Sequence, residues 1–275
     1  MFFEVTGPLR VTGDDGHPVK LPRGRVRQLL AVLLLMEGPV AESQLCEWLS
    51  GTGKSITGST LRTHVTALRR ALGDAACRVR TEPAGYQIDV RPGECDLQLF
   101  HELAIRGRSA LYDQDYESAT TLLRTAAELW REPALADLPD TPDLWPQMTK
   151  LAEERRLVCE SLIDAMLGLG RHREVIPELL QRCEIDPPQE RTFEQLMTAL
   201  YRSGRRAEAF DVYRSLCSRL SESHGADPGP VAKDLHQRIL TDDSELLLSV
   251  DVMTHDAIAL HHPTAGSNHR VGVLR

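Results

Sequence analysis

The sequence lacks the features of secreted, membrane-spanning and zinc-binding proteins. Its six cysteines (46, 77, 95, 159, 183 and 217) include no pair at CxxC spacing, so neither a disulfide framework nor a zinc finger is indicated. The N-terminus, MFFEVTGPLR, has no basic region followed by a long apolar stretch, unlike a signal peptide. The most apolar run, Leu29 to Met36, is far shorter than the roughly 20 residues of a bilayer span. We therefore expect a cytoplasmic protein whose cysteines are small buried residues.

Motifs of enzymes and of cofactor sites are also missing. There is no nucleophile elbow, no HExxH motif and no pair of carboxylates within a recognisable catalytic motif. The loop GTGKS resembles the end of a P-loop, but Trp48 stands where the first glycine of that motif belongs. The pair His261-His262 has no cysteine or carboxylate at ligand spacing. The sequence therefore predicts no enzyme, no cofactor and no metal, and Lys54 in the loop becomes a candidate phosphate contact.

Charge is distributed unevenly along the chain. Its 275 residues carry 32 Lys and Arg against 40 Asp and Glu, and this net −8 argues against binding to nucleic acid. However, residues 1–95 carry 12 basic and 10 acidic residues, whereas residues 96–275 carry 20 and 30. Between positions 57 and 81, five arginines oppose one acid, Asp74. We therefore expect two parts with different roles and a basic surface in the first.

Residues 1–95 predict a winged helix-turn-helix. Short β-type runs between positions 2 and 20, separated by Gly, Pro and Asp, predict a small antiparallel sheet. Three helices follow, with apolar stripes at Val26, Leu29, Leu30, Leu33 and Leu34, then Leu45, Trp48 and Leu49, then Leu61, Val65, Leu68 and Leu72. The stretch CRVRTEPAGYQIDV predicts a hairpin that turns at 83–85. In a winged helix the third helix enters the major groove and the hairpin contacts flanking DNA.

The face of the third helix opposite its apolar stripe carries side chains that suit DNA: Arg62, Thr63, His64, Thr66, Arg69 and Arg70. Arginine suits phosphates and guanine edges, and threonine and histidine can donate to base or phosphate oxygens. Arg78 and Arg80 of the predicted hairpin add to the charge. The alternatives are a solvated face on a structural helix, and a helical-repeat scaffold whose winged helix binds protein instead of DNA.

From Asp96 the helical period predicts an all-α, tetratricopeptide-like repeat domain over 96–242. Segments 113–126, 170–182 and 204–216 share a turn, an acidic residue and apolar residues at matching offsets, so that Ala119, Val175 and Ala209 correspond, as do Leu123, Leu179 and Tyr213. Gly170 and Gly204 are 34 residues apart, which is the tetratricopeptide period. Because the first interval is 56, a plain helical bundle is the alternative. The proline-rich segment 131–146 is predicted to be a long loop, and 243–275 a flexible tail.

The motif HVTALRRALG, followed by a strand and EPAGYQI, resembles the OmpR-type winged helix. This resemblance implies base contacts for Thr63, His64 and Ala67. It implies phosphate contacts for Thr66, Arg69 and Thr81, and a wing that begins at Arg80. Response regulators often carry arginines at the positions of Thr66 and Ala67, so this sequence shifts the expected specificity toward DNA shape.

The second half contains ELWREPALADLPD, PQERTFEQLMTALYRSGRRAEAFDVYRSL and ADPGPVAKDLHQRIL, and it resembles the bacterial transcriptional activator domain. A winged helix followed by that domain is the layout of the Streptomyces antibiotic regulatory protein (SARP) family, and the resemblance covers about residues 1–242. It implies a nucleoid-associated activator that binds direct repeats near the promoter −35 element, as side-by-side homodimers. It also implies recruitment of RNA polymerase holoenzyme to secondary-metabolite genes. Larger members append an ATPase and sensor region, so we expect a short form regulated by its abundance.

Overall fold

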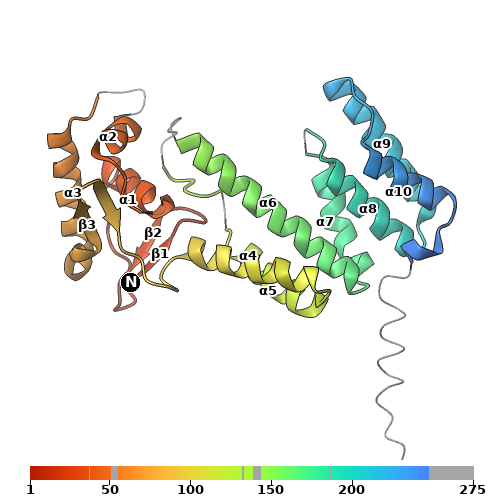
Figure 1. Ribbon diagram of the computed structural model, residues 1–275, viewed down its shortest axis with the longest axis horizontal. Coiled ribbons are helices and arrows are strands. Elements are labelled where there is room, and N and C mark those ends of the chain that lie inside the picture. The colour runs from red at the N-terminus through yellow and green to blue at the C-terminus, as the bar shows by residue number, and fades with distance from the viewer. Residues whose placement is uncertain (37, 51–54, 132, 139–143, 186, 248–275) are drawn as a thin grey trace, which may run out of the picture. The chain divides into compact units, whose positions relative to one another are not determined.

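A computed structural model of the protein describes residues 1–36, 38–50, 55–131, 133–138, 144–185 and 187–247. The chain forms two compact units, Met1–Ala165 and a second that begins at Met166 (Figure 1). The predicted fold class, mainly α with a small β component, is confirmed.

The first unit begins with a winged helix-turn-helix. Strands β1 and β2 pair antiparallel, with Phe3 opposite Val11. Three helices follow, and a 3-10 helix then leads into the antiparallel wing of strands β3 and β4. The elements are β1 (Phe2–Glu4), β2 (Arg10–Thr12), α1 (Arg25–Leu35), α2 (Glu42–Ser50), α3 (Gly58–Leu72), η1 (Gly73–Arg78), β3 (Val79–Glu82) and β4 (Gly85–Ile88).

The core of the winged helix consists of the apolar stripes that the sequence predicts. Helix α3 packs against α1 and α2, and its four stripe residues are buried: Leu61, Val65, Leu68 and Leu72. Leu29 and Leu30 of α1 and Leu45 and Leu49 of α2 are fully buried. Burying such side chains contributes roughly 1.5–3 kcal/mol each, so this packing fixes which face of α3 remains in solvent.

Gly85, at the entry of β4, is required by a close backbone contact. Its φ is +145°, and a Cβ placed there would lie 1.9 Å from the carbonyl oxygen of Val40. Next to it, Tyr86 exchanges two backbone hydrogen bonds with Val40, at 2.8 and 2.9 Å. The Gly-Tyr pair therefore joins the wing to the segment that precedes α2.

The first unit continues with helices α4 (Asp96–Tyr112), α5 (Tyr116–Glu128) and most of α6 (Trp145–Gly168). Helices α4 and α5 form a close hairpin. The close approach requires glycine at position 107 of α4, because a Cβ there would lie 2.6 Å from Cγ of Leu123 in α5. The predicted end of the loop at residue 146 is wrong, because Trp145 and Pro146 already belong to α6. A proline fits there, because the first turn of a helix needs no amide donor from it.

The second unit contains the end of α6 and helices α7 (His172–Cys183), α8 (Glu190–Arg202), α9 (Arg206–His224) and α10 (Pro230–Leu240). Successive helices pack in pairs, α7 on α8 and α8 on α9, and α10 packs on both α8 and α9. A short helix, η3 (Ser244–Leu246), follows. It places the buried Leu246 in what was predicted to be the start of the tail, and residues 248–275 lie outside the described residues.

Among the described residues of the helical part, the same turn recurs four times. In each turn a residue with positive φ precedes an amide that donates to the carbonyl five residues earlier, at 2.9–3.0 Å. The positive-φ residues are Gln114, Gly170, Gly204 and Asp242. The 34-residue spacing of Gly170 and Gly204 is thus the spacing between two copies of this turn. The fourth turn cannot be recognised in the sequence, because Asp242 stands where glycine is expected.

Candidate nucleic-acid interface

Helix α3 presents an exposed polar face. The helix begins after Thr57, whose hydroxyl accepts a hydrogen bond from the amide of Thr60 and so caps the helix. Opposite the buried stripe, the exposed residues include four predicted contacts: Arg62, Thr63, Thr66 and Arg70. The structure thus brings these four side chains together on one accessible helix face.

The two exposed threonines have already used their hydroxyl protons. Thr63 Oγ1 donates to the carbonyl of Ser59 at 3.1 Å, and Thr66 Oγ1 donates to the carbonyl of Arg62 at 2.8 Å. Toward solvent they therefore offer methyl groups and acceptor lone pairs.

His64 and Ala67, also predicted to face bases, are half-buried. Burial lowers the pKa of His64, and the charge of Arg25 lowers it further, so the neutral ring prevails at pH 7.

Two exposed arginines near this face pair with carboxylates. Arg62 lies 3.5 Å from Glu42 of α2, and Arg80 of the wing lies 2.8 Å from Asp89. Both arginine side chains remain more than half exposed, at 68% and 56%. Such exposed pairs contribute little stability, so either arginine can exchange its carboxylate for a phosphate at low cost. Arg70 is exposed and has no ion pair among the described residues.

Arg69 binds the wing instead of pointing to solvent. Its guanidinium donates to the Val79 carbonyl from Nε at 3.0 Å and from Nη2 at 2.6 Å. It also donates to Thr81 Oγ1 at 2.8 Å. The predicted phosphate contacts of Arg69 and Thr81 stay untested, and the structure gives both residues a different task, which is to hold the wing against α3.

Arg78 is a structural residue. It forms a bidentate ion pair with Glu94, in which Nη2 lies 2.9 Å from Oε1. Its side chain is only 11% exposed. This pairing lowers the pKa of Glu94 from 4.5 to about 2. A guanidinium engaged in this way cannot reach a phosphate without leaving its partner, so we do not place Arg78 in the interface. Lys54 lies outside the described residues.

A buried carboxylate anchors the N-terminal sheet to α4, and nothing in the sequence indicates it. Asp96, which is 3% exposed, accepts hydrogen bonds from the amides of Val5 and Thr6 at 2.8 and 3.1 Å. Thr6 Oγ1 lies 2.7 Å both from the Asp96 carboxylate and from the carbonyl of Leu129. The segment that follows β1 is therefore attached both to the start of α4 and to the residue that follows α5.

The segment after α5 extends this attachment. The amide of Leu9 donates to Asp137 at 2.8 Å, and Arg27 of α1 binds both Asp137 and the Leu9 carbonyl. The amide of Leu135 donates to the carbonyl of Gly7 at 2.8 Å. These contacts join the first strands to helices beyond residue 95 within the first compact unit, and the domain boundary at residue 95 stays a prediction.

The described residues show neither a metal site nor a membrane-spanning helix. They contain no group of three or more His, Cys, Asp and Glu side chains arranged to hold a metal ion. No helix among them is both long and apolar enough to cross a membrane. The histidines at 255, 261, 262 and 269 lie outside this part of the chain.

Comparison with known proteins identifies the family. The model of the family described as bacterial transcriptional activator domain matches residues 95–240, which is more than half of the chain. The chain belongs to this activator-domain family. Its relatives also support membership in the narrower SARP family of regulators, which the sequence resembles. In this family, helices α4–α10 of the present chain are the activator domain, and the winged helix precedes it.

The curated relatives are named as regulators. The chain is 37% identical to the regulatory protein AfsR of Streptomyces griseus over 90% of its own length, but it spans only 25% of AfsR. It is 31% identical to the regulatory protein DnrI of Streptomyces peucetius, covering 88% of this chain and 93% of that one.

One solved structure is similar over almost the whole chain. It is EmbR of Mycobacterium tuberculosis in complex with a low-affinity phosphopeptide, with a TM-score of 0.84 and 30% identity, and it covers 94% of this chain and 70% of EmbR.

Proposed function

We propose that this activator-domain protein is a sequence-specific DNA-binding transcriptional activator. Helix α3 enters the major groove with Thr63, His64 and Ala67 toward base edges and Thr66 toward a phosphate. Arg62, Arg70 and Arg80 contact phosphates on either side. The observation that carries the proposal is the exposed polar face of α3, flanked by arginines and held at a fixed angle to the wing by Arg69.

The exposed face of α3 has few hydrogen-bond donors for base edges, and this limits how it can recognise a DNA sequence. The hydroxyl protons of Thr63 and Thr66 are engaged, so this face has few donors for guanine edges. Methyl contacts and DNA shape therefore supply a large share of the specificity, and neutral His64 can donate one hydrogen bond.

The direct-repeat operator, the −35 position and RNA polymerase holoenzyme as partner are carried over from the family. Two copies on direct repeats would bind side by side in head-to-tail contact rather than across a two-fold axis. The acidic second half fits this arrangement. Residues 96–275 carry 30 acidic and 20 basic residues, so they are repelled by DNA and remain available to polymerase. A nucleoid-associated location and control of secondary-metabolite genes follow from the same proposal.

Fluorescence anisotropy on a promoter fragment with direct repeats tests the proposal. We expect saturable binding that weakens steeply with salt, and loss of affinity in Arg70→Ala and Arg80→Ala. Arg106→Ala is the matched control, because Arg106 is an exposed arginine of α4 paired with Glu102. Failure of wild type to bind any such fragment at low salt would contradict DNA recognition and favour the scaffold alternative.

Polymerase recruitment needs a separate measurement. We expect promoter DNA loaded with the protein to retain more holoenzyme than the same DNA alone. Equal retention would remove the polymerase part of the proposal without affecting DNA binding.

A further inference from the structure

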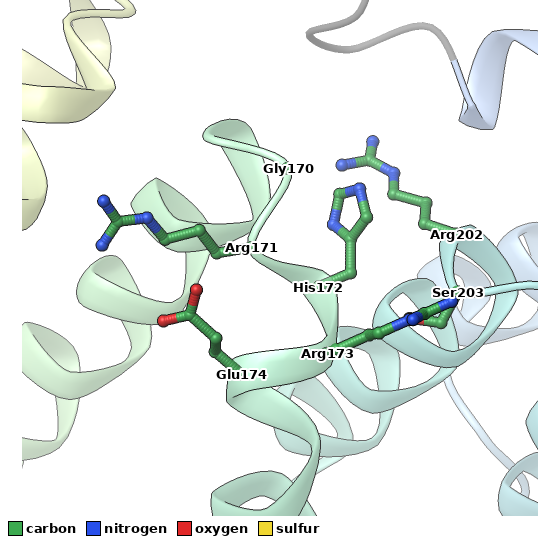
Figure 2. A pocket seen from close by; sticks show the side chains of 7 residues that line it. All are labelled: Gly170, Arg171, His172, Arg173, Glu174, Arg202 and Ser203. Carbon is green, nitrogen blue, oxygen red and sulfur yellow. The ribbon is translucent and has the colours of Figure 1, made fainter.

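The second unit contains a cationic hollow at the turn between α6 and α7. Its volume is about 340 Å³, and it lies where the start of α7 meets the end of α8 (Figure 2). It is lined by Gly170, Arg171, His172, Arg173, Glu174, Arg202 and Ser203. Three of these residues are arginines and one is acidic. We propose that this hollow binds a phosphate group, either as the free ion or as part of a phosphorylated small molecule.

Two of the three arginines that line the hollow have no carboxylate partner among the described residues. Elsewhere in the second unit, arginines such as Arg182, Arg205 and Arg238 pair with carboxylates at 2.6–3.1 Å. Arg171 and Arg173 are exposed, and neither has an ion pair or hydrogen-bonded partner among the described residues. Two unpaired cations in an overall acidic part of the chain leave a local positive field that an anion can fill.

A buried hydroxyl supplies a second, independent observation. Ser203 Oγ is shielded from solvent and makes no hydrogen bond within the part of the chain that the structure describes. Leaving a buried polar atom unsatisfied is unfavourable, and such atoms in native structures often mark the place of a ligand or water. Figure 2 shows Ser203 on the same side of the turn as Arg173, His172 and Arg202, with Arg171 and Glu174 on the other side.

Arg202 is held in place in part by two backbone carbonyls. Its Nε donates to the Leu246 carbonyl at 2.7 Å, and Nη1 lies 3.3 Å from the carbonyl of Leu167. These carbonyls orient the guanidinium. A ligand in the hollow therefore meets the oriented guanidinium of Arg202 and the exposed side chain of Arg173.

The first turn of α7 adds donors of a third kind. Its N-cap residue, Arg171, forms no side-chain cap, and neither does Arg205 at the equivalent turn before α9, whereas Asp115 caps α5 and Asp243 caps η3. The first amides of α7 are therefore available to an external acceptor. Guanidinium groups, a hydroxyl and amides that line one hollow suit the oxygens of a tetrahedral anion better than a planar carboxylate.

Isothermal titration calorimetry on the full chain at constant ionic strength tests the site, with inorganic phosphate, glucose 6-phosphate and acetate as probes. We expect saturable binding of phosphate or of glucose 6-phosphate, and weaker binding of acetate. Preference for one of the first two identifies the source of the phosphate group. Binding of neither, or tighter binding of acetate, would overturn the proposal.

Three variants locate the site. Arg173→Ala should weaken binding about tenfold or more, the usual effect of removing a charged hydrogen bond. Glu174→Gln removes the acidic side chain of the lining and should tighten binding, a gain that misfolding cannot produce. Arg214→Ala, at an exposed arginine paired with Asp211, is the control and should leave binding unchanged. Unchanged affinity in both Arg173→Ala and Glu174→Gln would place any bound phosphate elsewhere and refute the assignment.

Discussion

The guanidinium of Arg69 and the carbonyl oxygen of Val79 are joined by two hydrogen bonds, which connect the last turn of α3 to the first residue of the wing. A third bond to Thr81 completes the clamp. An arginine expected to bind DNA directly is thus engaged within the protein. This difference leads to a measurable distinction between neighbouring arginines.

Arg69→Ala and Arg70→Ala should weaken DNA binding in different ways. Loss of Arg70 removes a phosphate contact, so the slope of log affinity against log salt should fall by about 1. Loss of Arg69 frees the wing, so affinity should fall while the salt slope stays close to that of wild type. Anisotropy titrations at four or five salt concentrations measure both values. A slope reduced equally in both variants would restore Arg69 as a phosphate contact.

Asp89→Asn should strengthen DNA binding. It removes the carboxylate that lies 2.8 Å from Arg80 and also a negative charge beside the wing. Because such exposed pairs are weak, we expect a gain of about two- to fivefold at low salt that vanishes as salt rises. Asp113→Asn, at an exposed acid in the α4–α5 turn, serves as the control. An equal gain in both variants would show only the effect of net charge.

Asp96→Ala should destabilise the protein by about 3 kcal/mol or more, because it leaves the amides of Val5 and Thr6 buried without an acceptor. The free energy of unfolding in urea measures the loss. Asp113→Ala is again the matched exposed control, with an expected change below about 0.5 kcal/mol. A loss below about 1 kcal/mol for Asp96→Ala would mean that the anchor contributes little.

The Arg78–Glu94 pair should make stability depend on acid pH. The folded-state pKa of Glu94 is lowered from 4.5 to about 2 by the hydrogen bonds and charge of Arg78. The resulting stability is present above about pH 5 and is lost as the pH falls toward 2, because the unfolded chain then binds the proton first. Glu94→Gln should therefore be less stable than wild type at pH 7, with a difference that shrinks at pH 3.

Urea midpoints at pH 7, 5 and 3 test this dependence. Glu102→Gln, which removes an exposed partner of Arg106, should show a small difference at every pH. A difference between wild type and Glu94→Gln that is constant from pH 7 to 3 would contradict the role of the ion pair.

Periodicity and local turn chemistry were sufficient to predict most of the architecture. The stripe Leu61, Val65, Leu68 and Leu72 located α3 and its buried side, and Gly170 and Gly204 located two of the four equal turns. These signals are visible in sequence because each depends on residues close together in the chain. The fourth turn was missed because Asp242 adopts a positive φ that usually marks glycine.

The partners of individual charged side chains could not be predicted. Arg69, Arg70 and Arg78 look alike in the sequence, yet one clamps the wing, one is exposed and one pairs with Glu94. Which task each performs depends on where Val79 and Glu94 lie after folding. For the same reason Asp96 went unnoticed, since its partners are about 90 residues away in the chain.

The attachment of the first strands to α4 and to the segment around Asp137 sets a rule for building chimaeras. An exchange of DNA readers between related regulators at residue 95 would separate Thr6 from Leu129 and Leu9 from Asp137, and would pair each with a foreign surface. A crossover placed after Leu138 would carry the reader together with its own support. Recombination between such genes is therefore expected to preserve function when the breakpoint falls between α5 and α6, and to lose it when the breakpoint falls at residue 95.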